Sequence, residues 1–200
     1  MLTTQFLKKP TLYLSLLTIA VLTTPGCKGD QPVDSKEIAM DLNKPKNDLA
    51  KEQDERFLVS IAEFDFEQIL LGKLARQRAT STEVKELAMM LEDDHRTSKS
   101  KLSSMAIMKS IAVPSTPTKA AHLAYDQLNE ASVEDFDVAY LTRVVASHNE
   151  AITKFEECIR GNNDPDIRTW AIGKLPDLRM HLTKAMELDA QFGPLSELIR

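Results

Sequence analysis

Residues 132–160 read SVEDFDVAYLTRVVASHNEAITKFEECIR, a stretch in which apolar side chains recur at every third or fourth position. That spacing gathers them on one face of a helix. Ser132 and Asp135 precede the first apolar residue and Gly161 follows the last, which are start and stop signals for a helix. One polar residue, His148, interrupts the apolar face. We therefore predict a long amphipathic helix with a histidine in its buried stripe.

Three further stretches share this periodicity. They cover residues 54–79, 80–109 and 164–192. A hydroxyl three residues before a glutamate, Thr80 with Glu83, is typical of the start of a helix. Asp164 followed by Pro165 predicts another start, and Pro176 is expected to kink that last helix. The chain thus contains four long helical segments of similar length.

The overall composition agrees with this pattern. Glycine occurs only 6 times in 200 residues and aromatic residues make up 6% of the chain. Leu, Ala, Glu, Lys and Met, which all favour helices, are plentiful. This composition argues against a sandwich, a barrel or a doubly wound sheet, so we expect an all-α protein.

The connections between the four segments indicate how they are arranged. Two connections are short, whereas about twenty residues with prolines at 114 and 117 separate the second segment from the third. A short amphipathic piece, 119–129, lies in this crossover. One long crossover is typical of ferritin-like bundles. We predict a ferritin-like four-helix bundle over residues 54–192 with a short helix in its long crossover, followed by a C-terminal tail, 193–200.

The first 27 residues have the form of an export signal. Lys8 and Lys9 give a basic start, an apolar run covers 11–24, and Cys27 follows a glycine before the chain turns polar. A membrane-anchor helix is the alternative, but fourteen residues fall short of the roughly 20 needed to cross a bilayer. The Gly-Cys junction resembles the cleavage site of bacterial lipoproteins. We predict a lipoprotein-type signal peptide over 1–27 and a lipid on Cys27 that attaches the protein to the membrane.

The residue after this cysteine bears on where the protein resides. Lys28 is not the aspartate that retains such lipoproteins at the inner membrane, so we expect the cell envelope, at the periplasmic face of the outer membrane. The other cysteine, Cys158, has no free partner if Cys27 is acylated. Stability must then come from the core and not from a disulfide.

Residues 28–53 differ from the periodic segments in composition. They are charged and poor in apolar residues, and they include Pro32 and Pro45. Such a segment lacks the apolar surface needed to pack against a core. We predict a flexible tether that lets a domain beginning near Asp54 stand away from the membrane.

Each long segment carries one titratable or metal-competent residue within its apolar stripe. These residues are Glu67, His95, His148 and His181. At 1.5 Å per residue, the first two lie about 18 and 21 Å from the turn that joins their helices, and the last two about 18 and 24 Å from theirs. We therefore expect all four side chains to meet in one layer near the middle of the bundle.

Two functions from different classes are compatible with such a layer. Three imidazoles with one carboxylate suit a single Zn, Fe or Mn ion, with Glu92 and Asp94 as candidates to orient the ligands. The protein would then be a metal-binding bundle with a possible redox-protective role. The alternative is a structural, interaction or stress-related envelope lipoprotein in which the buried polar layer only specifies helix register. The sequence ranks this alternative slightly higher.

Other classes are disfavoured. Beyond residue 27 the chain holds 23 basic against 30 acidic side chains, which argues against nucleic acid as a partner. A nucleophile elbow, a phosphate-binding loop and zinc-finger spacing are all missing from the sequence. The sequence therefore leans against an enzyme.

Several of these elements also carry a resemblance. They are 57–79 with Gly72-Lys73-Leu74-Ala75, Asp94-His95, Phe136-Asp137 with Tyr140-Leu141, His148, and Leu175-Pro176-Asp177-Leu178 with His181. Over about 57–188 the chain resembles the bacterial envelope proteins of domain-of-unknown-function family 4142. The resemblance implies a ferritin-like bundle in an exported, often lipoprotein, setting, and it implies no activity.

The chain departs from the di-iron pattern of ferritins. Glu67 fits the first carboxylate, and Glu92 with His95 fits the first Glu-x-x-His motif. However, His148 stands where the pattern requires Glu, and Leu178 occupies the Glu position of the second motif. This departure argues against iron storage.

Overall fold

The computed structural model describes residues 33–43, 48–161 and 164–192. These residues form six α-helices and no strands: α1 (Ser35–Leu42), α2 (Leu49–Arg78), α3 (Thr82–Met108), α4 (Lys119–Asn129), α5 (Phe136–Arg160) and α6 (Pro165–Phe192). The prediction of an all-α fold is confirmed. Among these helices, none has both the length and the apolar character required to cross a membrane.

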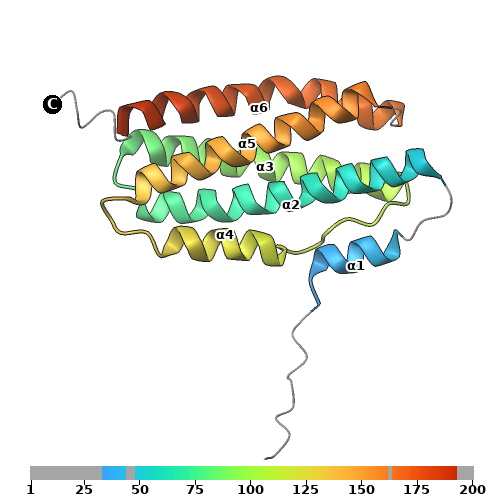
Figure 1. The fold of residues 1–200 in the computed structure, drawn as a ribbon, viewed down its shortest axis with the longest axis horizontal. Coiled ribbons are helices and arrows are strands. Elements are labelled where there is room, and N and C mark those ends of the chain that lie inside the picture. Colours follow the sequence, from blue (N-terminus) through green and yellow to red (C-terminus); the bar gives the residue numbers. More distant parts are fainter. Residues whose placement is uncertain (1–32, 44–47, 162–163, 193–200) are drawn as a thin grey trace, which may run out of the picture. The chain divides into compact units, whose positions relative to one another are not determined.

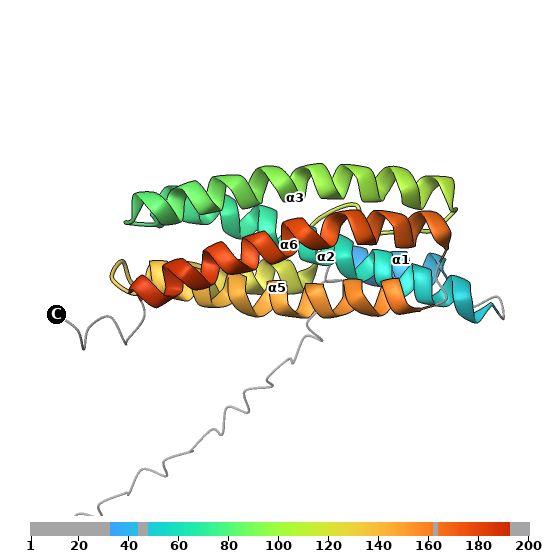
Figure 2. The same cartoon turned by 90° about the horizontal axis from the view of Figure 1, so that it is seen from above.

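The long helices α2, α3, α5 and α6 run side by side in a helical bundle (Figures 1 and 2). They correspond to the four predicted segments within a few residues, except that α2 begins five residues early. The short α4 lies in the connection between α3 and α5 and packs against α2. Its bounds are those predicted from the sequence.

A polar layer divides the core of this bundle into two apolar clusters. One cluster includes Phe57, Leu58, Leu102, Phe155 and Leu178. The other includes Leu71, Leu91, Leu141, Val144 and Ala185. The buried polar residues between them along the helices are Asp65, Glu67, Gln68, Glu92, His95, Ser98, Ser147, His148 and His181. The three histidine interruptions seen in the sequence thus lie in one polar layer at mid-height.

The turn between α2 and α3 is fixed by a carboxylate from another helix. Asp137 at the start of α5 accepts hydrogen bonds from the Thr80 amide (3.0 Å), the Thr80 hydroxyl (2.7 Å) and the Ser81 amide (2.8 Å). Because the Thr80 hydroxyl is engaged in this way, Ser81 caps α3 by accepting from the Val84 amide. The prediction that Thr80 is the cap is therefore wrong by one residue.

A close approach of α2 and α3 accompanies this turn. At Gly72, an added Cβ would lie 2.9 Å from the carbonyl oxygen of Ala88 and 3.1 Å from the Cβ of Glu92. No side chain fits there without a shift of the backbone. Gly72 therefore sets the distance between the two helices directly beside the polar layer.

The structure differs from the predicted tether over the residues that it describes there, 33–43 and 48–53. Residues 35–42 form α1, and α2 begins at Leu49. The Asn43 side chain donates to the Ala112 carbonyl (2.7 Å) and accepts from the Ala112 amide (2.8 Å). Polar contacts of this kind hold α1 in place, and they leave no apolar pattern in the sequence of this segment. The predicted signal peptide 1–27, residues 28–32 and the predicted tail 193–200 lie outside the described residues.

Candidate metal centre

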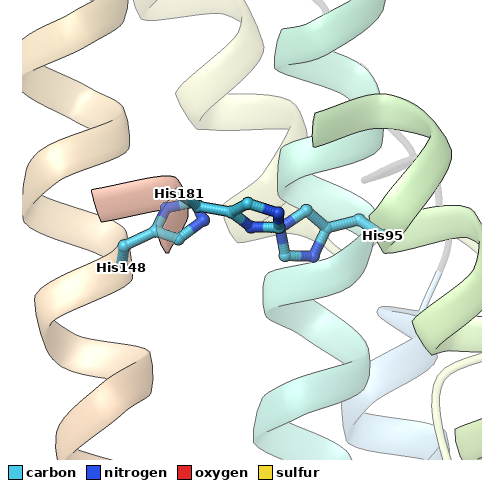
Figure 3. A group of neighbouring side chains, drawn as sticks. All are labelled: His95, His148 and His181. Atoms are coloured by element: carbon cyan, nitrogen blue, oxygen red, sulfur yellow. The ribbon is translucent and has the colours of Figure 1, made fainter. Parts of the chain in front are cut away.

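Three histidines from three helices meet in the polar layer. His95 comes from α3, His148 from α5 and His181 from α6, and their rings point toward one another (Figure 3). The ring centroids lie 5.4, 5.5 and 5.6 Å apart, close to an equilateral triangle. One ligand nitrogen of each ring lies within 4.8 Å of the other two. All three side chains are at most 1% exposed.

The fourth wall of this cluster comes from α2. The ring of Phe64 meets those of His95 and His148 edge to face, with centroids 4.9 and 5.2 Å away. The next residue, Asp65, is buried and bonds to one of the histidines. A hydrophobic ring and a carboxylate thus enclose the cluster on the side of α2.

Each histidine uses one ring nitrogen to bond to a fixed partner. The Nδ1 atom of His148 donates to the backbone carbonyl of Val144 (2.9 Å), which leaves the lone pair on its Nε2. The Nε2 atom of His181 donates to Asp94 (2.9 Å), and the Nδ1 atom of His95 shares a hydrogen bond with Asp65 (2.8 Å). Partners of this type hold metal-binding histidines in one tautomer and orientation.

The second nitrogen of each ring has no hydrogen-bond partner. These atoms are His95 Nε2, His148 Nε2 and His181 Nδ1, all of them buried. A buried polar atom without a partner costs about 1–3 kcal/mol. Three such atoms in one cluster indicate a site that gains its full set of contacts only when something binds there.

Burial keeps the three imidazoles neutral. It lowers the pKa of His95 and His148 well below the ordinary value, and the neighbouring histidines lower both further. Burial also lowers the pKa of His181, although Asp94 acts in the opposite direction. Neutral imidazole is the form that coordinates a metal, so the cluster is ready to bind one at neutral pH.

The buried carboxyl group of Asp65 adds a counter-charge. Burial raises the pKa of Asp65 well above the ordinary value, with smaller opposing effects from Ser98, Lys174 and Lys99. Its Oδ2 atom has no partner, while Oδ1 bonds to His95. A cation at the centre of the cluster would favour the ionised carboxylate, because opposite charges attract strongly in a medium of low dielectric constant.

The donor set fits a transition-metal ion. Zinc–nitrogen bonds of about 2.0–2.1 Å in a tetrahedron place the ligand nitrogens about 3.3 Å apart, so the rings need only a small inward movement from their present spacing. A single water molecule donates only two hydrogen bonds, whereas three buried nitrogens lack a partner. Three imidazoles around one ion also leave a position for a further ligand.

Glu67 is not part of the cluster, contrary to the prediction. Its carboxylate accepts two hydrogen bonds from the guanidinium of Arg143, at 2.9 and 2.6 Å. Each residue along a helix turns the side chain by about 100°, so Asp65 faces the layer and Glu67 points toward the flank of α5. The carboxyl group in the layer is therefore that of Asp65. It lies beside His95 and does not face all three histidines.

The two predicted orienting residues have different outcomes. Glu92 accepts hydrogen bonds from Arg76 (3.0 Å) and Arg96 (2.6 Å), which explains its burial without a role at the cluster. Asp94 does bond to a histidine of the cluster, but that histidine is His181 on α6 and not its neighbour His95.

Asp65 was missed, although the sequence contains a signal for it. Leu58, Ile61, Asp65, Gln68 and Gly72 follow the spacing of three and four that defines the buried stripe of α2. The stripe based on Phe64 and Glu67 has the same spacing of three and four, and the two stripes are offset by one residue, or about 100° around the helix. A strict count along the helix from Leu58 would have favoured Asp65.

Comparison with known proteins places the chain in a family. A family model described as a domain of unknown function, DUF4142, matches residues 39–188, three quarters of the chain. The matched range begins inside α1 and includes all three histidines of the cluster. No curated protein and no solved structure matches the chain.

Proposed function

Because this chain belongs to the DUF4142 family, a domain of unknown function, we propose a function from its own site: the helical bundle holds one transition-metal ion between His95, His148 and His181. We place the protein in the bacterial envelope, with a lipid on Cys27. The four long helices and the long connection that carries α4 support assignment of the bundle to the ferritin-like class.

One observation carries this proposal. Each histidine makes a hydrogen bond through one nitrogen, and its other nitrogen is buried without a partner. In a polar layer that served only to set helix register, buried groups would satisfy one another. The layer does not do so here, and a metal ion supplies the missing interaction for all three rings at once.

The donor types favour zinc among the three metals expected from the sequence. With Glu67 bound to Arg143, the first coordination sphere consists of three imidazoles and no carboxylate. Imidazole suits Zn²⁺ well, whereas Mn²⁺ prefers oxygen ligands. The carboxylates of Asp65 and Asp94, which bond to the histidines, offset the charge of a divalent ion.

Burial favours a holding role over turnover. The three histidines are enclosed by the two apolar clusters, and a zinc enzyme needs a bound water that a substrate can reach. We therefore propose that the ion stabilises the bundle or is sequestered by it.

Metal analysis of protein purified without an affinity tag tests the proposal. We expect zinc at one ion per chain and a melting temperature that rises with added Zn²⁺ and falls with a chelator. His148→Leu, similar in size, should abolish this response, whereas Asn149→Leu on the exposed side of the same helix should preserve it. Metal-free protein that Zn²⁺, Fe²⁺, Mn²⁺ and Cu²⁺ all fail to stabilise would make the layer purely structural.

A further inference from the structure

The short helix α1 is fixed to the rest of the molecule at both of its ends. At its start, Ser35 donates to the Thr116 carbonyl (2.7 Å) and Asp34 accepts from the Lys119 amide (3.2 Å). At its end, Asn43 makes the paired hydrogen bonds with Ala112. In the middle, Ala39 is buried. The side of α1 that faces outward is thus determined by the fold.

The residues opposite Ala39 are Glu37 and Asp41, and the flank of α1 beside them carries large apolar residues. Of the thirteen exposed large hydrophobic side chains among the described residues, five lie between positions 33 and 49: Val33, Ile38, Met40, Leu42 and Leu49. Ile38 and Leu42 are four residues apart and therefore neighbours on one face of the helix. Leu42 is 71% exposed. Such a concentration in a short segment marks an interaction surface.

The length of the preceding chain limits what this surface can meet. Val33 follows Cys27 by only six residues. Six residues, fully extended, span at most about 20 Å. With a lipid on Cys27, the start of α1 lies within that distance of the headgroups, so the bundle cannot stand away from the membrane as a long tether would allow.

We propose that the apolar flank of α1, formed by Ile38 and Leu42, docks on the lipid surface and holds the bundle against the membrane. The proposal rests on the lipid anchor of the proposed function and is independent of the metal. Glu37 and Asp41 are exposed on the same helix, so anionic headgroups do not attract this surface. Contact depends on apolar side chains entering the interface, and we expect it to be insensitive to salt.

The test uses the full lipidated protein in vesicles of phosphatidylethanolamine with a minority of phosphatidylglycerol. A nitroxide label is attached at Leu42→Cys or, as a matched control, at Leu123→Cys on α4. Leu123 is also apolar and 58% exposed, and it is far from Cys27 in sequence. Cys158 is buried, and Cys27 carries the lipid, so the new cysteine is the site that reacts. Mass spectrometry of residue 27 and flotation with the vesicles establish the anchor first.

We expect the label at position 42 to be several-fold more accessible to lipid-soluble oxygen than to a water-soluble nickel complex, and the label at 123 to show the reverse. Equal water exposure at both positions, with the anchor present, would overturn the docking proposal alone. A label at 42 that is shielded from both reagents would also overturn it, because a protein would then cover α1. A chain without lipid on Cys27 would overturn the anchor and the docking together.

Discussion

His181 donates from Nε2 to Asp94 Oδ2 over 2.9 Å, and the two side chains differ in exposure: that of His181 is fully buried, whereas 42% of that of Asp94 is exposed. The bond crosses from α6 to α3. The other two histidines bond to groups that are themselves buried, Asp65 and the carbonyl of Val144. Asp94 therefore connects a buried histidine of the cluster to a carboxylate that solvent reaches.

Replacing this carboxylate should weaken metal binding without removing a ligand. Asp94→Asn keeps an oxygen that can accept from His181 but loses the negative charge that makes the imidazole a stronger ligand. We expect zinc affinity to fall by about 10-fold or more, as is usual for such partners. Competition with a chromophoric chelator measures the change. Asp93→Asn, which alters an exposed neighbour, should leave the affinity unchanged. Equal affinity in both variants would mean that Asp94 does not act through the histidine.

The metal-free protein should lose stability as the pH falls below about 6.5. Burial lowers the pKa of the three histidines in the folded chain, so the unfolded chain binds protons first, from its ordinary pKa of about 6.5 downward. Each histidine contributes at most about 1.4 kcal/mol per pH unit in that window. Urea unfolding with a chelator present, at a series of pH values, measures the slope.

The titration of Asp65 has the opposite effect on stability. Burial raises its pKa, so its folded form keeps a proton that the unfolded chain releases above about 3.9. The net slope below pH 6.5 is therefore smaller than that of the histidines alone. His148→Leu removes one titrating group and should flatten the slope further. A stability that is constant from about pH 7.5 to 5.5, on either side of the ordinary histidine pKa, would contradict this account.

Two glycines that lie within helices of the described residues, Gly72 and Gly173, provide a matched pair. Gly72→Ala places a methyl group 2.9 Å from the Ala88 carbonyl, and we expect a loss of about 1–3 kcal/mol from overpacking, reduced by the better helix propensity of alanine. Gly173→Ala meets nothing within 4 Å and should stabilise the protein by about 0.5–1 kcal/mol. Thermal unfolding of both variants measures these changes in stability. If both substitutions changed the stability in the same direction, the close approach of α2 and α3 at Gly72 would be contradicted.

Removing the attachment of α1 should destabilise the protein measurably. Asn43→Ala deletes both hydrogen bonds to Ala112, and we expect a loss of about 1–2 kcal/mol in the free energy of unfolding. Glu37→Gln, at an exposed position of the same helix, is the control. If Asn43→Ala and its control unfold at the same urea concentration, α1 does not contribute to the stability of the bundle.

Changing the predicted lipidation site should release the protein. Cys27→Ser removes the thiol that would carry the lipid, so we expect either a soluble protein in the periplasm or medium or an uncleaved precursor. Fractionation and intact mass distinguish these forms. A processed variant that remains on the membrane like the parent protein would show that the attachment does not depend on Cys27.

The sequence alone determined the four long helices, α4 and most of the polar layer. Periodicity, caps and prolines are local signals, and they placed α4 at 119–129 and ended α6 at Phe192. His95, His148 and His181 interrupt apolar stripes at similar heights, so their meeting follows from helix geometry once the helices pack together. The family could also be predicted, because its motifs lie within these same helices.

Tertiary structure decided which carboxylates join the layer and where α1 lies. Asp65 and Glu67 are two residues apart, and about 200° of rotation separates their side chains, so the choice depends on how α2 turns against its three neighbours. Asp94 reaches His181 only because α3 and α6 are adjacent. α1 is held by hydrogen bonds to residues about seventy to eighty positions away, and such long-range polar pairing leaves no periodic trace in the sequence, because it depends on where the folded chain brings each partner.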